Sequence, residues 1–117
     1  MILALHVKDM EKSLAFYSTL LGLSVLRRHS PGEGREMVFL GEDGKPRLEL
    51  ILTGEGATYA GFSIGFPVDD LAGIKERLAR HGYPVTREVV AGPDTTLCFL
   101  EGPNGEQVEL IADAATH

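Results

Sequence analysis

Two short segments, one in each half of the chain, have nearly the same sequence and constrain the fold more than any other feature. Residues 47–52 read Arg-Leu-Glu-Leu-Ile-Leu, and residues 107–112 read Gln-Val-Glu-Leu-Ile-Ala. Each has the apolar, branched composition of a β-strand, with one glutamate, Glu49 or Glu109, in its middle. Side chains alternate between the two faces of a strand. One face can therefore pack on helices, while the other, with its glutamate, lines a cavity.

A glutamate inside an apolar strand requires a partner, because an ionised carboxylate is costly to bury without a metal, a cation or hydrogen-bond donors. Simple pairing with Arg47 or His6 is one interpretation, but the duplicated position favours a cavity-lining role for Glu49 and Glu109. Such carboxylates can act as a general base or bind an amine or hydroxyl ligand. The alternative is a weak divalent-metal site completed by water or substrate oxygens, which suits Mg²⁺ or Mn²⁺ better than zinc.

The similarity between the two halves extends beyond these strands. Val7 matches Val68, and Phe39 matches Phe99. The residues of the second pair are separated by one position fewer than those of the first pair. The second half therefore has one residue fewer between these two matches, and the difference falls near the end of the predicted helix. We predict an α+β fold of two tandem βαβββ modules with cupped mixed sheets, at about 1–53 and 61–112, joined by a linker at 54–60.

Local signals predict the elements of each module. Asp9 and Asp70 each precede an amphipathic stretch and are suited to cap a helix, and Gly22 and Gly82 are suited to end one. The predicted helices are 10–21 and 71–80, and the predicted strands are 1–8, 23–29, 36–40, 47–52, 61–68, 85–91, 95–100 and 107–112. Asp43-Gly44 predicts a tight turn between two strands.

Composition limits the classes of partner. The 117 residues suit one domain, and a net charge of −6 argues against nucleic acid or an anionic membrane as the main partner. Charged residues interrupt the apolar start before a secretory signal can form, and no stretch reaches the length of a membrane span. The single cysteine, Cys98, lies in an apolar strand, where a small core residue is expected. We expect a cytoplasmic protein.

Several segments resemble a known superfamily. Residues 7–17, followed by Leu-Leu-Gly-Leu at 20–23, are similar to the opening of the vicinal oxygen chelate superfamily, and Gly-Pro-Asn-Gly-Glu-Gln-Val-Glu-Leu-Ile at 102–111 is similar to its closing strand. This superfamily includes glyoxalase I, methylmalonyl-CoA epimerase, extradiol dioxygenases and bleomycin- or fosfomycin-resistance proteins. The resemblance covers nearly the whole chain. It implies cupped sheets with outer helices and a homodimer whose modules pair within or across chains, but it does not identify a substrate.

The resemblance also implies where a metal would bind. Members with a metal use four ligands, usually histidine or glutamine on the first strand of each module and glutamate on the last. These positions correspond here to Ile2, Ser63, Glu49 and Glu109. An isoleucine cannot bind a metal, and a serine is a weak neutral ligand. His6 lies on the same strand face as Ile2 but roughly 13 Å further along an extended strand, too far to replace it.

The leading interpretation is therefore a protein that binds a small organic molecule without a cofactor and without the usual histidine-containing metal site. The residues expected to line its cavity are Glu49, Glu109, His6, Ser63, Ala4 and Gly65. For His6 a core histidine held by one hydrogen bond, and for the three small residues ordinary packing, are the competing interpretations.

Two further interpretations of the function stay open. The alternative is a glyoxalase I-like lyase, isomerase or dioxygenase, in which Glu49 and Glu109 hold Mg, Mn, Ni, Zn or Fe or one of them acts as base. Without the metal that normally stabilises the enediolate of such reactions, turnover by that route would be inefficient. A third interpretation, a non-catalytic partner module, requires a large exposed apolar patch.

Overall fold

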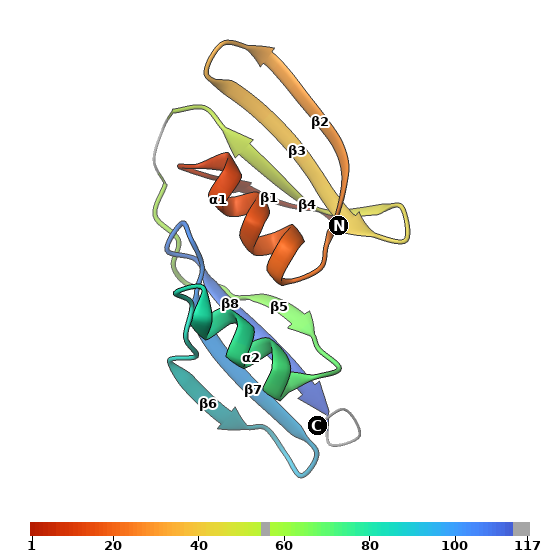
Figure 1. The fold of residues 1–117 in the computed structure, drawn as a ribbon, viewed down its shortest axis with the longest axis vertical. Helices are drawn as coiled ribbons and strands as arrows, with labels where there is room; N and C mark the ends of the chain where they lie inside the picture. Colours follow the sequence, from red (N-terminus) through yellow and green to blue (C-terminus); the bar gives the residue numbers. More distant parts are fainter. Residues whose placement is uncertain (55–56, 114–117) are drawn as a thin grey trace. The chain divides into compact units, whose positions relative to one another are not determined.

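The computed structural model of the chain describes residues 1–54 and 57–113. Contacts divide the chain into two compact units, Met1–Ala57 and Thr58–His117. In the described residues, each unit consists of a strand, a helical segment and three further strands, and its four strands form one mixed sheet (Figure 1). The predicted α+β fold of tandem βαβββ modules is confirmed.

The first unit places its glutamate strand inside the sheet. Its elements are β1 (Leu3–His6), α1 (Met10–Leu14), η1 (Ala15–Leu20), β2 (Ser24–Gly32), β3 (Arg35–Glu42) and β4 (Lys45–Leu52). The strand order is β1-β4-β3-β2, with β1 parallel to β4 and the other neighbours antiparallel. The register pairs Leu5 with Leu50, and both side chains are fully buried. The predicted alternation, with leucines towards the helical layer, is therefore confirmed.

The helix of the first unit begins where the sequence predicts and then changes its hydrogen bonding. The Asp9 side chain accepts a hydrogen bond from the backbone N–H of Lys12 at 3.0 Å, which caps α1. From Ala15 to Leu20 the segment is a π-helix, whereas the periodicity predicted one continuous α-helix to residue 21. The wider turns of a π-helix accompany full burial of the adjacent Phe16 and Tyr17, whose rings meet edge to face at 4.9 Å.

Turns connect the strands of the first unit. Asp43 and Gly44 both have positive φ, 52° and 74°, as a two-residue type I′ hairpin between β3 and β4 requires. The strand predicted at 23–29 extends to Gly32. Its extension is tied to β3 by the Ser30 hydroxyl, which donates to the carbonyl oxygens of Gly32 and Arg35 at 3.1 and 2.7 Å.

The second unit repeats this topology. Its elements are β5 (Ile64–Pro67), α2 (Leu71–Arg80), β6 (Arg87–Val90), β7 (Thr95–Glu101) and β8 (Gln107–Asp113), in the sheet order β5-β8-β7-β6. The first strand is shorter than the predicted 61–68. Gly61 has a φ of 83°, which is incompatible with an extended strand, and pairing with β8 begins at Ile64. The second predicted strand of this unit, 85–91, is likewise reduced to four residues.

Helix α2 packs its apolar side on the second sheet. The Asp70 side chain caps it by accepting a hydrogen bond from the N–H of Gly73 at 3.0 Å. Buried residues on the two layers are Leu71, Ile74 and Leu78 from the helix and Cys98, Leu100, Val108 and Leu110 from the sheet. Cys98 is thus a core residue, as expected, and burial raises the pKa of its thiol. Among the described residues, no helix combines the length and the apolar character needed to cross a bilayer.

A buried glutamate closes the turn that leads into β8. Glu106 is fully buried and accepts hydrogen bonds from the backbone N–H of Asn104 at 2.7 Å and from its Nδ2 at 3.0 Å. The carboxyl group lies against Gly102, where an added Cβ would come within 2.6 Å of the Glu106 Cδ. The glycine therefore allows the turn to fold over the carboxylate and sets the start of β8.

Candidate functional site

Glu49 lies on the face of the first sheet opposite the buried leucines. In the sheet register it pairs with Ala4 of β1 on one side and with Phe39 of β3 on the other. Paired residues on neighbouring strands point to the same face. Glu49 is half-buried between the Ala4 methyl group and the Phe39 ring. His6 lies two residues after Ala4 on β1, where it is exposed and pairs with Ile51 in the sheet register.

Glu109 has equivalent neighbours in the second sheet. It pairs with Gly65 of β5 and with Phe99 of β7, and it is also half-buried. A Cβ added at Gly65 would lie 3.8 Å from Glu109 Oε1 and 3.1 Å from the Cδ1 methyl of Ile111. The missing side chain therefore leaves the carboxylate uncovered on that side. Ser63 is exposed and lies just before β5, outside the paired strands.

An arginine extends the row in each unit. Arg27 pairs with Phe39 between β2 and β3, and Arg87 pairs with Phe99 between β6 and β7. The guanidinium carbon of Arg87 lies 4.6 Å from the centroid of the Phe99 ring, within cation–π range. Each sheet therefore carries the same row across its open face, consisting of a small residue, a glutamate, a phenylalanine and an arginine.

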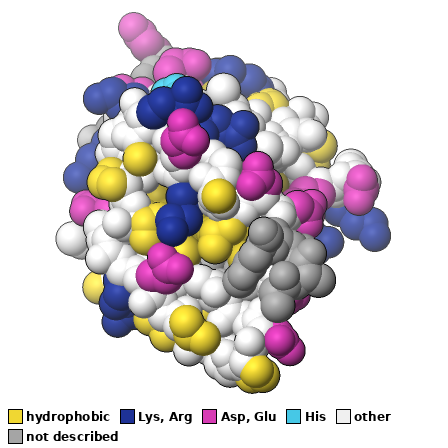
Figure 2. Space-filling view, turned by 60° about the horizontal axis from the view of Figure 1, so that its bottom comes forward, with side chains coloured by type: hydrophobic (Ala, Val, Ile, Leu, Met, Phe, Trp, Pro, Cys, Tyr) yellow, Lys and Arg dark blue, Asp and Glu magenta, His cyan; other side chains and the backbone are white. Residues whose placement is uncertain are grey.

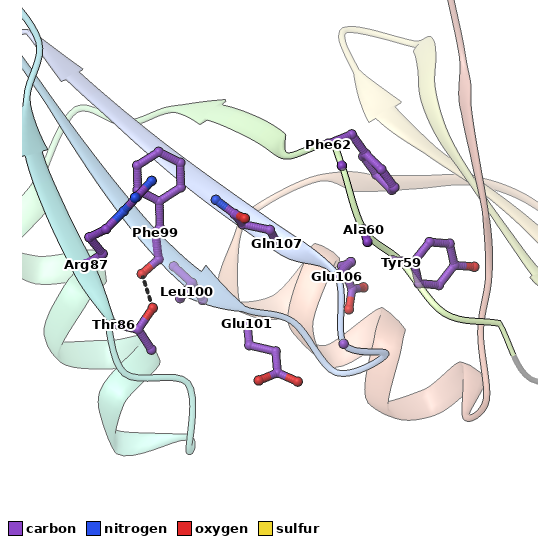
Figure 3. Close-up of a pocket in the computed structure, with 12 residues that line it drawn as sticks. Tyr59, Ala60, Phe62, Thr86, Arg87, Phe99, Leu100, Glu101, Glu106 and Gln107 are labelled. Carbon is purple, nitrogen blue, oxygen red and sulfur yellow. Dashed lines mark hydrogen bonds between the residues drawn. The ribbon is translucent and has the colours of Figure 1, made fainter.

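A cavity of about 600 Å³ lies within the second unit, beside the Glu109 row. Its principal side chains are Tyr59, Phe62, Thr86, Arg87, Phe99 and Gln107 (Figure 3). It includes Phe99, the neighbour of Glu109, and Gln107, which shares the open face of β8, but Glu109 itself is not among the lining residues. Its volume falls in the range typical of small-molecule sites.

The alternation along the strands correctly predicted that both glutamates lie on the open faces, but it missed the aromatic residues and Arg87. None of the six residues expected to line a cavity lines the cavity of the second unit, namely Glu49, Glu109, His6, Ser63, Ala4 and Gly65. One signal was available, because Arg27 and Arg87 have the same separation along the chain as Phe39 and Phe99. Tyr59 and Phe62 carry no such signal, because Tyr59 lies in the predicted linker and the position equivalent to Phe62 in the first half is Met1. Glu49 and Glu109 belong to different units.

The residues available for a metal differ from the four-donor set that the resemblance implies. Ile2 has no donor atom, and Ser63 offers only a neutral hydroxyl. Within residues 1–54 and 57–113, no three His, Cys, Asp or Glu side chains gather closely enough to hold a metal ion. Each unit contributes one glutamate, Glu49 or Glu109, as a candidate metal ligand. These donors do not fit a histidine-containing transition-metal site.

The surface charge is mixed rather than concentrated. Figure 2 shows Lys and Arg side chains interspersed with Asp and Glu side chains, and apolar side chains in separate small patches on this face. Elsewhere Arg28 bridges Glu36 and Glu11 at 2.8 and 3.2 Å, which raises the Arg28 pKa. Exposed pairs of this kind contribute little to stability. The face in view offers neither a basic surface for nucleic acid nor one large apolar patch.

Comparison with known proteins agrees with this architecture. The lactoylglutathione lyase of Haemophilus influenzae is 35% identical and aligns with 96% of this chain and 90% of its own length. The lactoylglutathione lyase of Neisseria meningitidis serogroup A is 38% identical, over 92% of this chain and 85% of its own length.

Solved structures show the same relationship. The trypanothione-dependent glyoxalase I of Leishmania major superimposes with a TM-score of 0.73 at 27% identity, covering 93% of this chain and 82% of that one. A glyoxalase family protein from Bacillus cereus shares the fold, with a TM-score of 0.80 at 21% identity over 96% of this chain and 91% of its own. The family model for the Glyoxalase/Bleomycin resistance protein/Dioxygenase superfamily matches residues 2–110. The chain therefore belongs to the Glyoxalase/Bleomycin resistance protein/Dioxygenase superfamily.

Proposed function

We propose that this chain is a glyoxalase I-like lyase or isomerase that acts on a small organic substrate at the open faces of its sheets. The observation that carries the proposal is its 35% identity to a lactoylglutathione lyase over 96% of the chain, together with the equivalent positions of Glu49 and Glu109 in the two sheets of this chain. The identity to a lyase favours the interpretation of the sequence as a glyoxalase I-like enzyme over its interpretation as a protein that binds a small molecule without turnover.

The side chains around Glu109 suit proton transfer. A carboxylate that is half-buried, next to a glycine and an aromatic ring, can reach a substrate C–H bond while Phe99 limits access of water. Glu49 has the same setting with Ala4 in place of glycine. In the proposed reaction one glutamate removes the proton next to a carbonyl group and returns it to the neighbouring carbon.

Binding without turnover is the second candidate. It is favoured by Ile2 and Ser63, which occupy the positions where the resemblance implies metal-binding side chains. A protein that lost those donors can keep the cavity of the second unit for ligand binding. This candidate retains the metal-free interpretation of the sequence. The homodimer, the cytoplasmic location and the divalent metal of the enzyme interpretation stay predictions.

One assay separates the candidates. The purified protein is supplied with the adduct of glutathione and methylglyoxal, with chelator or with Mg²⁺, Mn²⁺, Ni²⁺, Zn²⁺ or Fe²⁺, and formation of lactoylglutathione is followed by its thioester absorbance. Elemental analysis determines any retained metal. The enzyme proposal expects turnover that Glu109→Gln and, to a smaller extent, Glu49→Gln lower, while Glu76→Gln, on an exposed position of α2, leaves it unchanged.

The negative outcomes are also informative. Binding of lactoylglutathione, detected as a rise in melting temperature, without turnover under any condition would favour the second candidate. Absence of both turnover and binding would contradict both candidates for this substrate. Turnover that survives both glutamine substitutions would show that the reaction does not use these carboxylates.

A further inference from the structure

The cavity of the second unit has two chemically different ends. Figure 3 shows Arg87 over Phe99 at one end, Tyr59 and Phe62 at the other, and Gln107 between them. All five residues belong to the second unit, so the arrangement does not depend on the first. A cavity with a cation at one end and aromatic rings at the other is suited to an elongated ligand with an anionic and an apolar end.

Arg87 has the properties of an anion-binding group. It is exposed, and its guanidinium is held over the Phe99 ring at 4.6 Å. The adjacent Glu88 points to the other side of β6 and forms an ion pair with Lys75 of α2 at 3.1 Å. In the part of the chain that the structure describes, no carboxylate lies within ion-pair distance of Arg87. Its planar set of N–H donors therefore fits an incoming carboxylate in two-point contact.

The opposite end is apolar. The rings of Tyr59 and Phe62 meet edge to face with centroids 6.0 Å apart, and Phe62 is 39% exposed. Such a pair offers both a ring face and a ring edge to a third aromatic group. An aromatic side chain with this exposure gains stability when a ligand covers it.

The cavity has two acidic lining residues, Glu101 at the end of β7 and Glu106 in the turn between β7 and β8. Glu106 is buried and accepts two hydrogen bonds from Asn104, so its carboxylate is engaged within the turn. Glu101 is exposed, and in Figure 3 its carboxylate points away from Arg87. The cation at the Arg87 end therefore determines which ligand charge is accepted there.

We propose that this cavity binds a small carboxylate that carries an aromatic group at its far end. The carboxylate contacts the Arg87 guanidinium, the aromatic group packs against Tyr59 and Phe62, and Gln107 hydrogen-bonds a polar atom between them. The assignment goes beyond the proposed lyase activity and does not rest on it, because it concerns binding in the absence of turnover.

A graded set of probes tests the ligand class. Binding of 3-phenylpropionate, 4-phenylbutyrate and 5-phenylvalerate to the full chain is measured by isothermal titration calorimetry. The matched controls are 4-phenylbutanamide, which lacks the charge, and hexanoate, which lacks the ring. We expect the amide and hexanoate each to bind about tenfold more weakly than the best aryl carboxylate, because each loses one end of the site. Equal affinity of the amide and the acid would overturn the proposal.

Substitutions test the residues. Arg87→Gln is expected to weaken aryl carboxylate binding about tenfold and to remove most of its salt dependence, while Arg87→Lys retains the salt dependence and loses part of the affinity. Phe62→Ala is expected to weaken the aryl acids but not hexanoate. Arg80→Gln, at an exposed position of α2 outside the cavity, serves as the control and leaves binding unchanged.

Because Arg87 and Phe62 are exposed, we expect the variants at these positions to fold. The melting curve of each variant checks that it does. Unchanged binding in a folded Arg87→Gln protein overturns the assignment. Failure of the lyase assay leaves this result unaffected, and lyase turnover without any aryl carboxylate binding contradicts this inference alone.

Discussion

The two units carry the same row of side chains on sheets of the same topology. The helical segments and the lengths of the strands around this row differ between the units. In both, a glutamate pairs with a phenylalanine, which in turn pairs with an arginine. The first unit combines a π-helical segment with a nine-residue β2, whereas the second has a regular ten-residue α2 and a four-residue β6. The sheet centre is thus common to both, and the differences lie at its margins.

The cavity of the second unit lies at the margin of its sheet. The cavity combines residues of the repeated row, Arg87 and Phe99, with Tyr59 and Phe62 from the segment before β5. Duplication therefore accounts for the glutamates and their neighbours, but the proposed ligand binding in the second unit also uses Tyr59 and Phe62, which the first unit does not repeat. The predictions below test how far the two units are equivalent.

The largest difference is expected between the two glutamates. We predict that Glu109→Gln lowers turnover by about 100-fold or more, the usual contribution of a general base, and that Glu49→Gln lowers it less. The reason is that Gly65 leaves Glu109 uncovered, whereas the Ala4 methyl lies beside Glu49. Steady-state kinetics of both variants measures the ratio. A larger loss for Glu49→Gln would assign the base to the first unit.

Equal effects are expected in the two cores. Leu50 and Leu110 occupy equivalent positions of β4 and β8, each directly after the glutamate, and both are fully buried. Leu50→Ala and Leu110→Ala should each lower the free energy of unfolding by about 2–5 kcal/mol, as truncation of a buried leucine leaves a cavity. Urea denaturation measures both values. A difference above about 2 kcal/mol would show that the units do not share equivalent packing.

The helix caps provide a smaller test. Asp9 and Asp70 each accept a backbone hydrogen bond three residues on, at 3.0 Å in both cases. Asp9→Ala and Asp70→Ala should each cost about 1 kcal/mol of stability, and the asparagine variants, which can still cap, should cost less. Thermal unfolding compares the four proteins. A negligible effect at Asp9 alone would indicate that the π-helical continuation, not the cap, holds the first helix.

Alkaline pH should lower the stability of the second unit through Cys98 and Tyr83. Burial raises the pKa of Cys98 from 9.0 and that of Tyr83 from 10.0, with Glu106 adding to the Tyr83 shift. The unfolded chain then loses these protons at lower pH than the folded chain. Stability is therefore fully present below pH 9.0 and falls as pH rises from the unfolded towards the folded pKa values.

Substitution identifies the source of this alkaline effect. Denaturation of the natural chain at two pH values, 8 and about 10.5, is compared with that of Cys98→Ala, which removes the thiol contribution. The expected change is the smallest of the four. A pH dependence that Cys98→Ala leaves unaltered would assign it to other groups.

Local features made much of the fold predictable. The Asp-capped helix starts, the glycines that end the helices at positive φ and the Asp43-Gly44 hairpin each follow from one or two residues and their backbone preferences. The alternation around Glu49 and Glu109 predicted correctly which residues are buried against the helices. The ends of β2, β5 and β6 and the change to a π-helix were wrong or missed, because they depend on pairing and packing partners elsewhere in the chain.

The sequence by itself determined the duplicated modules, the faces of the strands and the positions of the two glutamates, because side-chain alternation and capping are local properties of the chain. Only the tertiary structure decided that Arg87 lies over Phe99, that Glu106 is buried in its own turn, and that Tyr59 and Phe62 join them at one cavity. These contacts depend on the register between strands and on the course of the segment before β5. Register depends on the packing of whole sheets as well as on the turns, so short local patterns do not specify these contacts.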